Sequence, residues 1–135
     1  MDRVTLKQKY GLHKTIVANP SGLIRWYNRL IEKTAEELDV QDVLRMARQK
    51  ILIDVAGNRA VDLFLTDPFA GEIDDGDLLE LLVSMGDVIK KNVNKQELKR
   101  VIDRAKKDMQ FFEWDSEENK VRFQRNLDKL NYILQ

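Results

Sequence analysis

Cysteine is absent from this chain of 135 residues, and histidine occurs once, as His13. The lack of cysteine excludes disulfide bonds, thiolate catalysis and thiolate metal sites together. One histidine cannot supply the usual zinc ligand sets. There is also no run of about 18 apolar residues, and the N-terminus, MDRVTLKQKYGLHK, lacks the apolar block of a signal peptide. We therefore expect a cytoplasmic chain with no metal, no cofactor and no membrane span.

The length and the composition, 43% hydrophobic and 34% charged residues, are ordinary for one globular domain. We expect a single domain over residues 1–135. Residues 1–20 have weak periodicity and end in the turn signature Asn19-Pro20-Ser21-Gly22, which predicts a loosely ordered or short-helical lead-in.

The remaining apolar residues recur at helical spacings, most strictly in the stripe Leu98, Val101, Ile102, Ala105 and Met109. The predicted N-caps are Ser21, Asp39, Asn94, Asp115 and an aspartate just ahead of Leu78. The predicted helices span about residues 21–33, 39–51, 51–65, 78–83, 94–109 and 115–134. Gly57-Asn58 marks either a kink or a boundary between two short helices. Only residues 4–6 and 51–53 resemble strands, and both are short. The prediction is an all-α, compact single-domain bundle of five to six helices.

Two aromatic groups are predicted to pack in or against the core. Trp26 and Tyr27 stand beside basic residues, as in nucleic-acid stacking sites, but their spacing on a helix favours the core. Phe111, Phe112 and Trp114 lie in a predicted connector, where we expect them to seal the bottom of the core.

Charge is unevenly distributed although the net charge is zero. Residues 1–35 carry a balance of +5, residues 36–87 one of −9, and residues 88–135 one of +4. Acids also gather at helix N-termini and on solvated faces for structural reasons alone. A field of one sign, however, steers partners of the opposite sign.

The acidic residues concentrate around one predicted turn: Glu72, Asp74, Asp75, Asp77 and Glu80. An EF-hand would need an oxygen donor and a glutamate where Gly71 and Leu82 stand, so a calcium loop is not predicted. Carboxylates bunched on an exposed loop stay ionised and lack a partner of contrasting pKa. The chain also has no nucleotide-binding loop and no nucleophile elbow. We therefore predict that it is not an enzyme.

Residues 33–82 contain a predicted leading helix, an Arg-Gln pair, a helix end with Pro, and a Gly-Asp-Leu-Leu helix start. The residues that form this succession are Leu38, Asp42, Arg48, Gln49, Ala60, Val61, Phe64, Pro68, Phe69, Gly76, Asp77, Leu78 and Leu79. In these motifs the stretch resembles a small group of immunity proteins from bacterial contact-dependent growth inhibition systems. This chain departs from the group at Asp74-Asp75-Gly76, where an aromatic residue and Pro-Gly are usual.

The resemblance implies a protein that binds and inactivates the C-terminal toxin domain of a large effector, usually a nuclease. Nuclease sites carry Lys and Arg for phosphate, which an acidic surface can occupy. The predicted toxin-binding residues are the five acids above, with Phe69 or Ile73 as apolar anchors. The alternative is a regulatory or nucleic-acid-binding module. It would use a basic face formed by Arg25, Arg29 and Lys33, or by Lys99, Arg100, Lys106 and Lys107.

Overall fold

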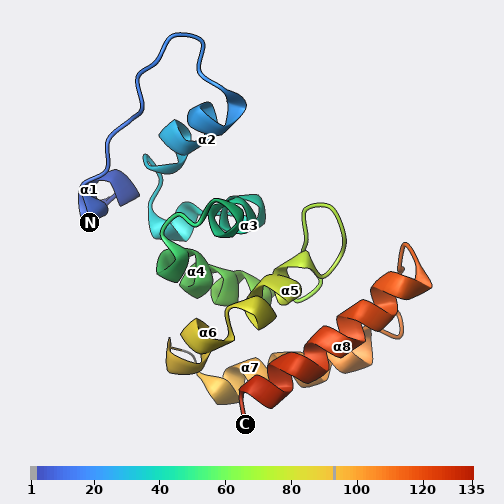
Figure 1. The fold of residues 1–135 in the computed structure, drawn as a ribbon. Helices are drawn as coiled ribbons and strands as arrows, with labels where there is room; N and C mark the ends of the chain where they lie inside the picture. The colour runs from blue at the N-terminus through green and yellow to red at the C-terminus, as the bar shows by residue number, and fades with distance from the viewer. Residues whose placement is uncertain (1–2, 93) are drawn as a thin grey trace.

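The computed structural model describes residues 3–92 and 94–135, which form eight α-helices, one 3-10 helix and no strand (Figure 1). The elements are α1 (Leu6–Tyr10), α2 (Gly22–Leu30), η1 (Ala35–Glu37), α3 (Val40–Gln49), α4 (Ile53–Thr66), α5 (Asp77–Ser84), α6 (Gly86–Asn92), α7 (Lys95–Asp108) and α8 (Glu117–Ile133). The all-α prediction is confirmed, but the described part of the chain forms eight α-helices rather than five or six.

Two short helices account for the difference in number. The lead-in contains α1, which begins with a capping box between Thr5 and Gln8; residues 1 and 2 of the lead-in lie outside the described residues. Helix α6 follows α5 almost at once. The alternative of a boundary between two short helices at Gly57-Asn58 is wrong, because α4 runs through both residues. A Cβ at Gly57 would lie 2.8 Å from the Met85 side chain, so this glycine serves close packing.

The N-caps of α5 and α8 also differ from expectation. Gly76, rather than an aspartate, precedes α5, and Ser116, rather than Asp115, caps α8. The caps of α2, α3 and α7, which are Ser21, Asp39 and Asn94, are confirmed.

The helices are arranged along the molecule roughly in the order of the sequence (Figure 1). Helices α1 and α2 lie at one end, α3, α4 and α5 in the middle, and α6 with the antiparallel pair α7 and α8 at the other end (Figure 1). Residues 11–21 form a long loop that projects from the α1 and α2 end. None of the helices among residues 3–92 and 94–135 is long and apolar enough to cross a membrane.

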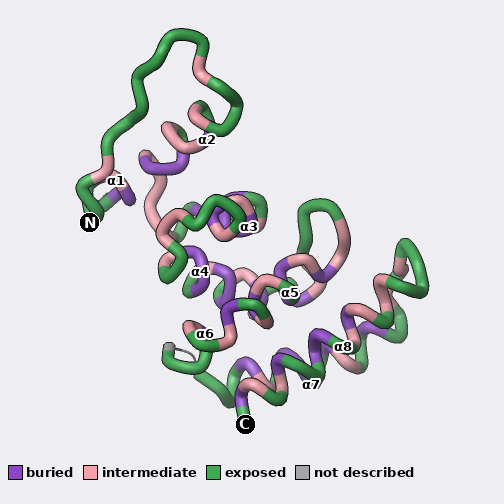
Figure 2. Tube along the Cα trace, in the orientation of Figure 1, coloured by how far each residue is buried: buried purple, intermediate pink, exposed green. Residues whose placement is uncertain are grey.

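Buried residues lie along the facing sides of these helices (Figure 2). The predicted apolar stripe of α7 is confirmed, because Leu98, Val101, Ile102, Ala105 and Met109 are all buried. Trp26 is also buried, which supports its assignment to the core.

A buried carboxylate, Asp42, joins α2 to α3. It accepts hydrogen bonds from Lys33 Nζ at 2.6 Å and Trp26 Nε1 at 3.1 Å, and from the backbone N–H of Asp39 at 3.2 Å. Burial alone would raise the pKa of Asp42, but the Lys33, Trp26 and Asp39 hydrogen bonds outweigh it and lower the pKa.

We predict that Asp42→Asn lowers the free energy of unfolding at pH 7 by about 1–2 kcal/mol, because the Lys33 ion pair is lost. A carboxyl whose pKa is lowered by folding stabilises the protein above its ordinary pKa of 3.8 and stops doing so as the pH falls. The difference between the two proteins should therefore shrink below about pH 4. Urea unfolding at several pH values measures it, and a difference that persists undiminished at pH 2 would contradict the assignment.

Candidate functional site

The acidic loop, residues 71–77, is closed by backbone hydrogen bonds between its ends. Gly76 N–H donates to Phe69 O at 2.8 Å and Leu78 N–H donates to Ala70 O at 3.1 Å. Inside the loop, Asp77 Oδ2 accepts from the backbone N–H groups of Glu72, Ile73 and Asp74 at 3.3, 3.0 and 3.0 Å. One predicted site residue, Asp77, thus holds the loop in shape.

Two glycines allow this tight path. Gly76 has φ +86°, and a Cβ there would lie 2.8 Å from the Phe123 ring. A Cβ at Gly71 would lie 1.8 Å from the backbone oxygen of Asp74. The loop therefore needs glycine for its backbone conformation at one position and for close approach at both.

An aromatic cluster fixes the loop to the rest of the molecule. The Phe69 ring stacks on Phe112 at 4.4 Å and on Phe123 at 4.8 Å between centroids, and Trp114 contacts all three. The expected sealing role is confirmed for Phe112 and Trp114, which pack here. It is wrong for Phe111, whose side chain is 87% exposed. Of the two expected anchors, Phe69 is used by the cluster and Ile73 is 81% exposed.

One guanidinium on α8 gathers three of the predicted acids. Arg122 Nη2 lies 3.3 Å from Asp77 Oδ1, and Nη1 lies 3.2 Å from Glu80 Oε2 and 4.0 Å from Asp74 Oδ2. Glu72 turns the other way and pairs with Arg48 of α3 at 3.2 Å. The structure thus brings Asp74, Asp77 and Glu80 together and directs Glu72 toward α3.

Asp75 has no ion pair with any residue of 3–92 or 94–135. Its pKa is raised, first by partial burial and then by the negative charges of Asp115, Asp67, Asp74 and Asp77. Asp67 follows α4, and Asp115 lies in the α7–α8 connector, residues 109–116. These two acids were missed by the sequence reasoning. The available signal was that residues 66–80 and 111–118 hold ten acids and no Lys or Arg.

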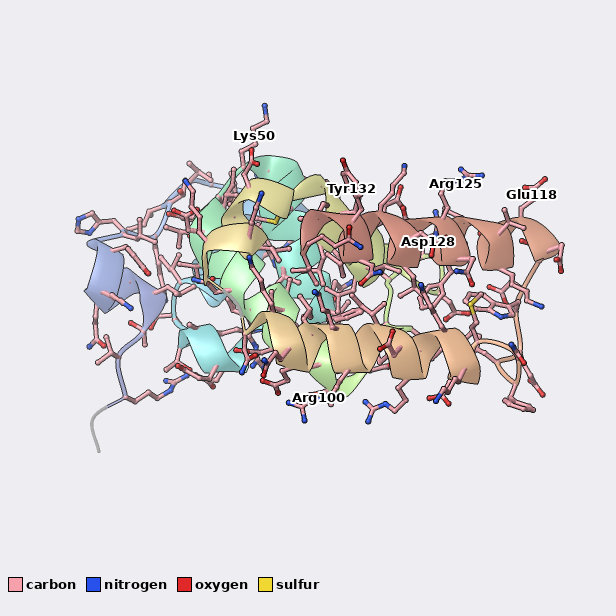
Figure 3. The ribbon with its side chains drawn as sticks, turned by 90° about the horizontal axis from the view of Figure 1, so that it is seen from below. Lys50, Arg100, Glu118, Arg125, Asp128 and Tyr132 are labelled. Atoms are coloured by element: carbon pink, nitrogen blue, oxygen red, sulfur yellow. The ribbon has the colours of Figure 1, made fainter. Side chains whose placement is uncertain are left out.

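The basic faces of the alternative interpretation are partly neutralised by their own chain. Lys33 pairs with Asp42 at 2.6 Å and Lys106 with Asp128 at 3.2 Å. Arg25 donates to Pro20 O at 2.9 Å, whereas Arg100 points outward from α7 (Figure 3). The two predicted basic faces therefore keep only some of their cations for a partner.

The acidic loop contains neither the single histidine nor any residue of the main hollow. No group of three or more His, Asp or Glu side chains among them is arranged to hold a metal ion. His13 is exposed in the loop between α1 and α2. A hollow is lined by Ile53 of α4, Val83 of α5, Tyr132 of α8 and residues of α6, and none of the five predicted acids lines it. The acidic loop instead presents charged side chains at the surface, with Ile73 exposed among them.

Residues 11–101 match the model of a protein family described as CDI immunity proteins, where CDI is contact-dependent growth inhibition. This chain belongs to that family. The match covers the acidic loop but ends before the α7–α8 connector and α8. Proteins of the family neutralise a CDI toxin and are generally not enzymes. A comparison with curated proteins finds no match.

We predict that Gly76→Ala lowers the free energy of unfolding by about 2–4 kcal/mol, because it adds left-handed strain and a contact with Phe123. Gly22→Ala is the matched control. A Cβ at Gly22 meets nothing within 4 Å, so that variant should be as stable as wild type or up to about 1 kcal/mol more stable. Equal stability of the two variants in urea unfolding would argue against the loop geometry.

We predict that Asp75→Asn is at least as stable as wild type at pH 7. A carboxyl whose pKa is raised by folding destabilises the native state once the pH exceeds its ordinary value of 3.8. Any gain in the free energy of unfolding, up to about 0.5 kcal/mol, should disappear as the pH falls below that value.

Asp77→Ala, which loses three backbone partners, should instead lower the free energy of unfolding by about 1–3 kcal/mol. Thermal unfolding at pH 7 and pH 3 separates the two carboxylates.

Proposed function

We propose that this chain binds the C-terminal toxin domain of its cognate CDI effector and neutralises it in the cytoplasm of the cell that makes both. The observation that carries this proposal is the family match over residues 11–101. In this proposal residues 1–135 act as one domain and perform no chemistry. Inhibition then depends on the surface that the domain presents to the toxin.

The acidic loop and the start of α5 form that surface in our proposal. Its residues are Glu72, Asp74, Asp75, Asp77 and Glu80. Two cations of the chain itself, Arg48 and Arg122, pair with four of these acids. Because Arg122 is shared by three carboxylates, negative charge remains in excess around it, and Asp75 adds a further charge. This excess supports attraction of a cationic partner.

The toxin is in our proposal a nuclease. A nuclease must hold phosphate groups, and it does so with Lys, Arg and backbone N–H groups. A surface of clustered carboxylates can contact the same cations and exclude nucleic acid from them. The acidic loop alone is too small for a stable complex, since a standard interface buries about 1,600 Å² in total. A neighbouring element must therefore add contacts.

We predict that the double reversal Asp74→Lys/Asp75→Lys weakens toxin binding by about 100-fold or more, mainly through slower association. The control Asp87→Lys/Asp103→Lys changes net charge equally on exposed positions of α6 and α7, so it should bind within about threefold of wild type. Surface plasmon resonance with the purified toxin domain measures both variants, and their unfolding midpoints check folding.

Protection of cells that express the toxin domain tests the function itself. A wild-type chain that neither binds the domain nor protects the cells would disprove the proposed function. A wild-type chain that protects, together with a loop reversal that protects equally well, would leave the function standing and remove the acidic loop from the interface.

A further inference from the structure

Two apolar side chains on the segments that carry the acidic residues are exposed to water. Ile73, in the acidic loop, is 81% exposed, and Phe111, in the α7–α8 connector, is 87% exposed. They belong to segments that are far apart in sequence and meet in the structure. Phe69 and Phe112 stack where the two segments join. Single exposed apolar residues are common on proteins, but here two lie on adjoining loops that share one negative field.

The backbone at both Ile73 and Phe111 is held by a hydrogen bond. The N–H of Ile73 donates to Asp77 Oδ2 at 3.0 Å, and the N–H of Phe111 donates to Asp108 O at 3.0 Å. The next residue, Phe112, is fixed in the aromatic cluster. Because these loops are already ordered, a partner that covers Ile73 and Phe111 loses little conformational entropy in doing so.

The charge around them indicates the kind of partner. The negative charges of Asp67 and Asp115 act on Asp75 together with those of its loop, so the acids of the two segments form one electrostatic unit. Segments 66–80 and 111–118 contain no Lys or Arg. The complementary surface is cationic and has apolar pockets for the two side chains, and it belongs to a folded protein because shaped pockets are needed to hold a Phe and an Ile side chain.

We propose that the acidic loop and the α7–α8 connector together form one toxin-binding surface, in which Phe111 and Ile73 are the apolar anchors and Asp67, Asp75 and Asp115 supply negative charge. This inference rests on the proposed function and extends it to residues outside the family match, which ends at residue 101. The connector supplies the additional contact area that the acidic loop lacks.

The chain offers matched controls for the two anchors. Ile16 is 93% exposed in the loop between α1 and α2, and Tyr132 is 77% exposed. Figure 3 shows Tyr132 at the end of α8 opposite to Glu118 and the connector. Removing these side chains deletes a comparable exposed apolar group elsewhere on the molecule.

Isothermal titration calorimetry should measure the affinity of the purified C-terminal toxin domain of the effector for the full-length chain and for four variants. We expect Phe111→Ala and Ile73→Ala each to weaken binding by about tenfold or more, as anchors at an interface centre do. We expect Ile16→Ala and Tyr132→Ala to bind within about twofold of wild type. Unfolding midpoints of all four variants should stay close to wild type, because the deleted groups are exposed.

A second readout does not depend on substitutions. In the complex, backbone amides of residues 70–76 and 110–116 should exchange with deuterium more slowly than in the free chain, and those of residues 12–18 should not change. If wild type binds the toxin domain but neither anchor variant weakens binding, or if Tyr132→Ala weakens it instead, the two-loop surface is wrong and the proposed function stands. If wild type does not bind the domain, both the two-loop surface and the proposed function are disproved.

Discussion

Stacking of the Phe69 ring between Phe112 and Phe123 is the contact on which the rest of the acidic surface depends. The backbone hydrogen bonds to Asp77 Oδ2 give the acidic loop its shape, but they are internal to the loop and cannot set its position. The aromatic cluster does so, because it joins the segment after α4 to the connector and to α8. Arg122, one residue before Phe123, is thereby placed beside the carboxylates. The same packing that buries the aromatic rings therefore also positions Arg122 and the carboxylates.

The parts of the fold that could be predicted from the sequence are those governed by local rules. The α7 stripe and the N-caps of α2, α3 and α7 depend on residues within one or two turns of each other, so spacing alone identifies them. Helix α6 was not predicted because it has seven residues and follows α5 with only Met85 between them. A helix boundary at Gly57 was a wrong prediction, because glycine is required there for another reason. The Met85 side chain, from another part of the chain, packs against this position and leaves no room for a Cβ.

The candidate site shows the same division. The concentration of acids is visible in the sequence, but the cations that face them are not, since Arg122 lies 45 residues beyond Asp77. The sequence also could not predict that Phe111 is exposed whereas Phe112 packs against Phe69. A connector has no periodicity to tell which of two neighbouring rings turns inward, and only the position of Phe69 decides it.

Arg122 also acts as a counterion that the chain carries with it. A cation of a partner that approaches Asp74 or Glu80 exchanges places with this guanidinium instead of meeting a bare carboxylate. The free-energy gain is then the difference between two similar contacts, and fewer dissolved ions are set free than the number of acids suggests. Association at this surface should consequently tolerate physiological ionic strength better than the formal charge of the two segments would indicate. Discrimination between partners would then rest more on the shape of the contact than on charge.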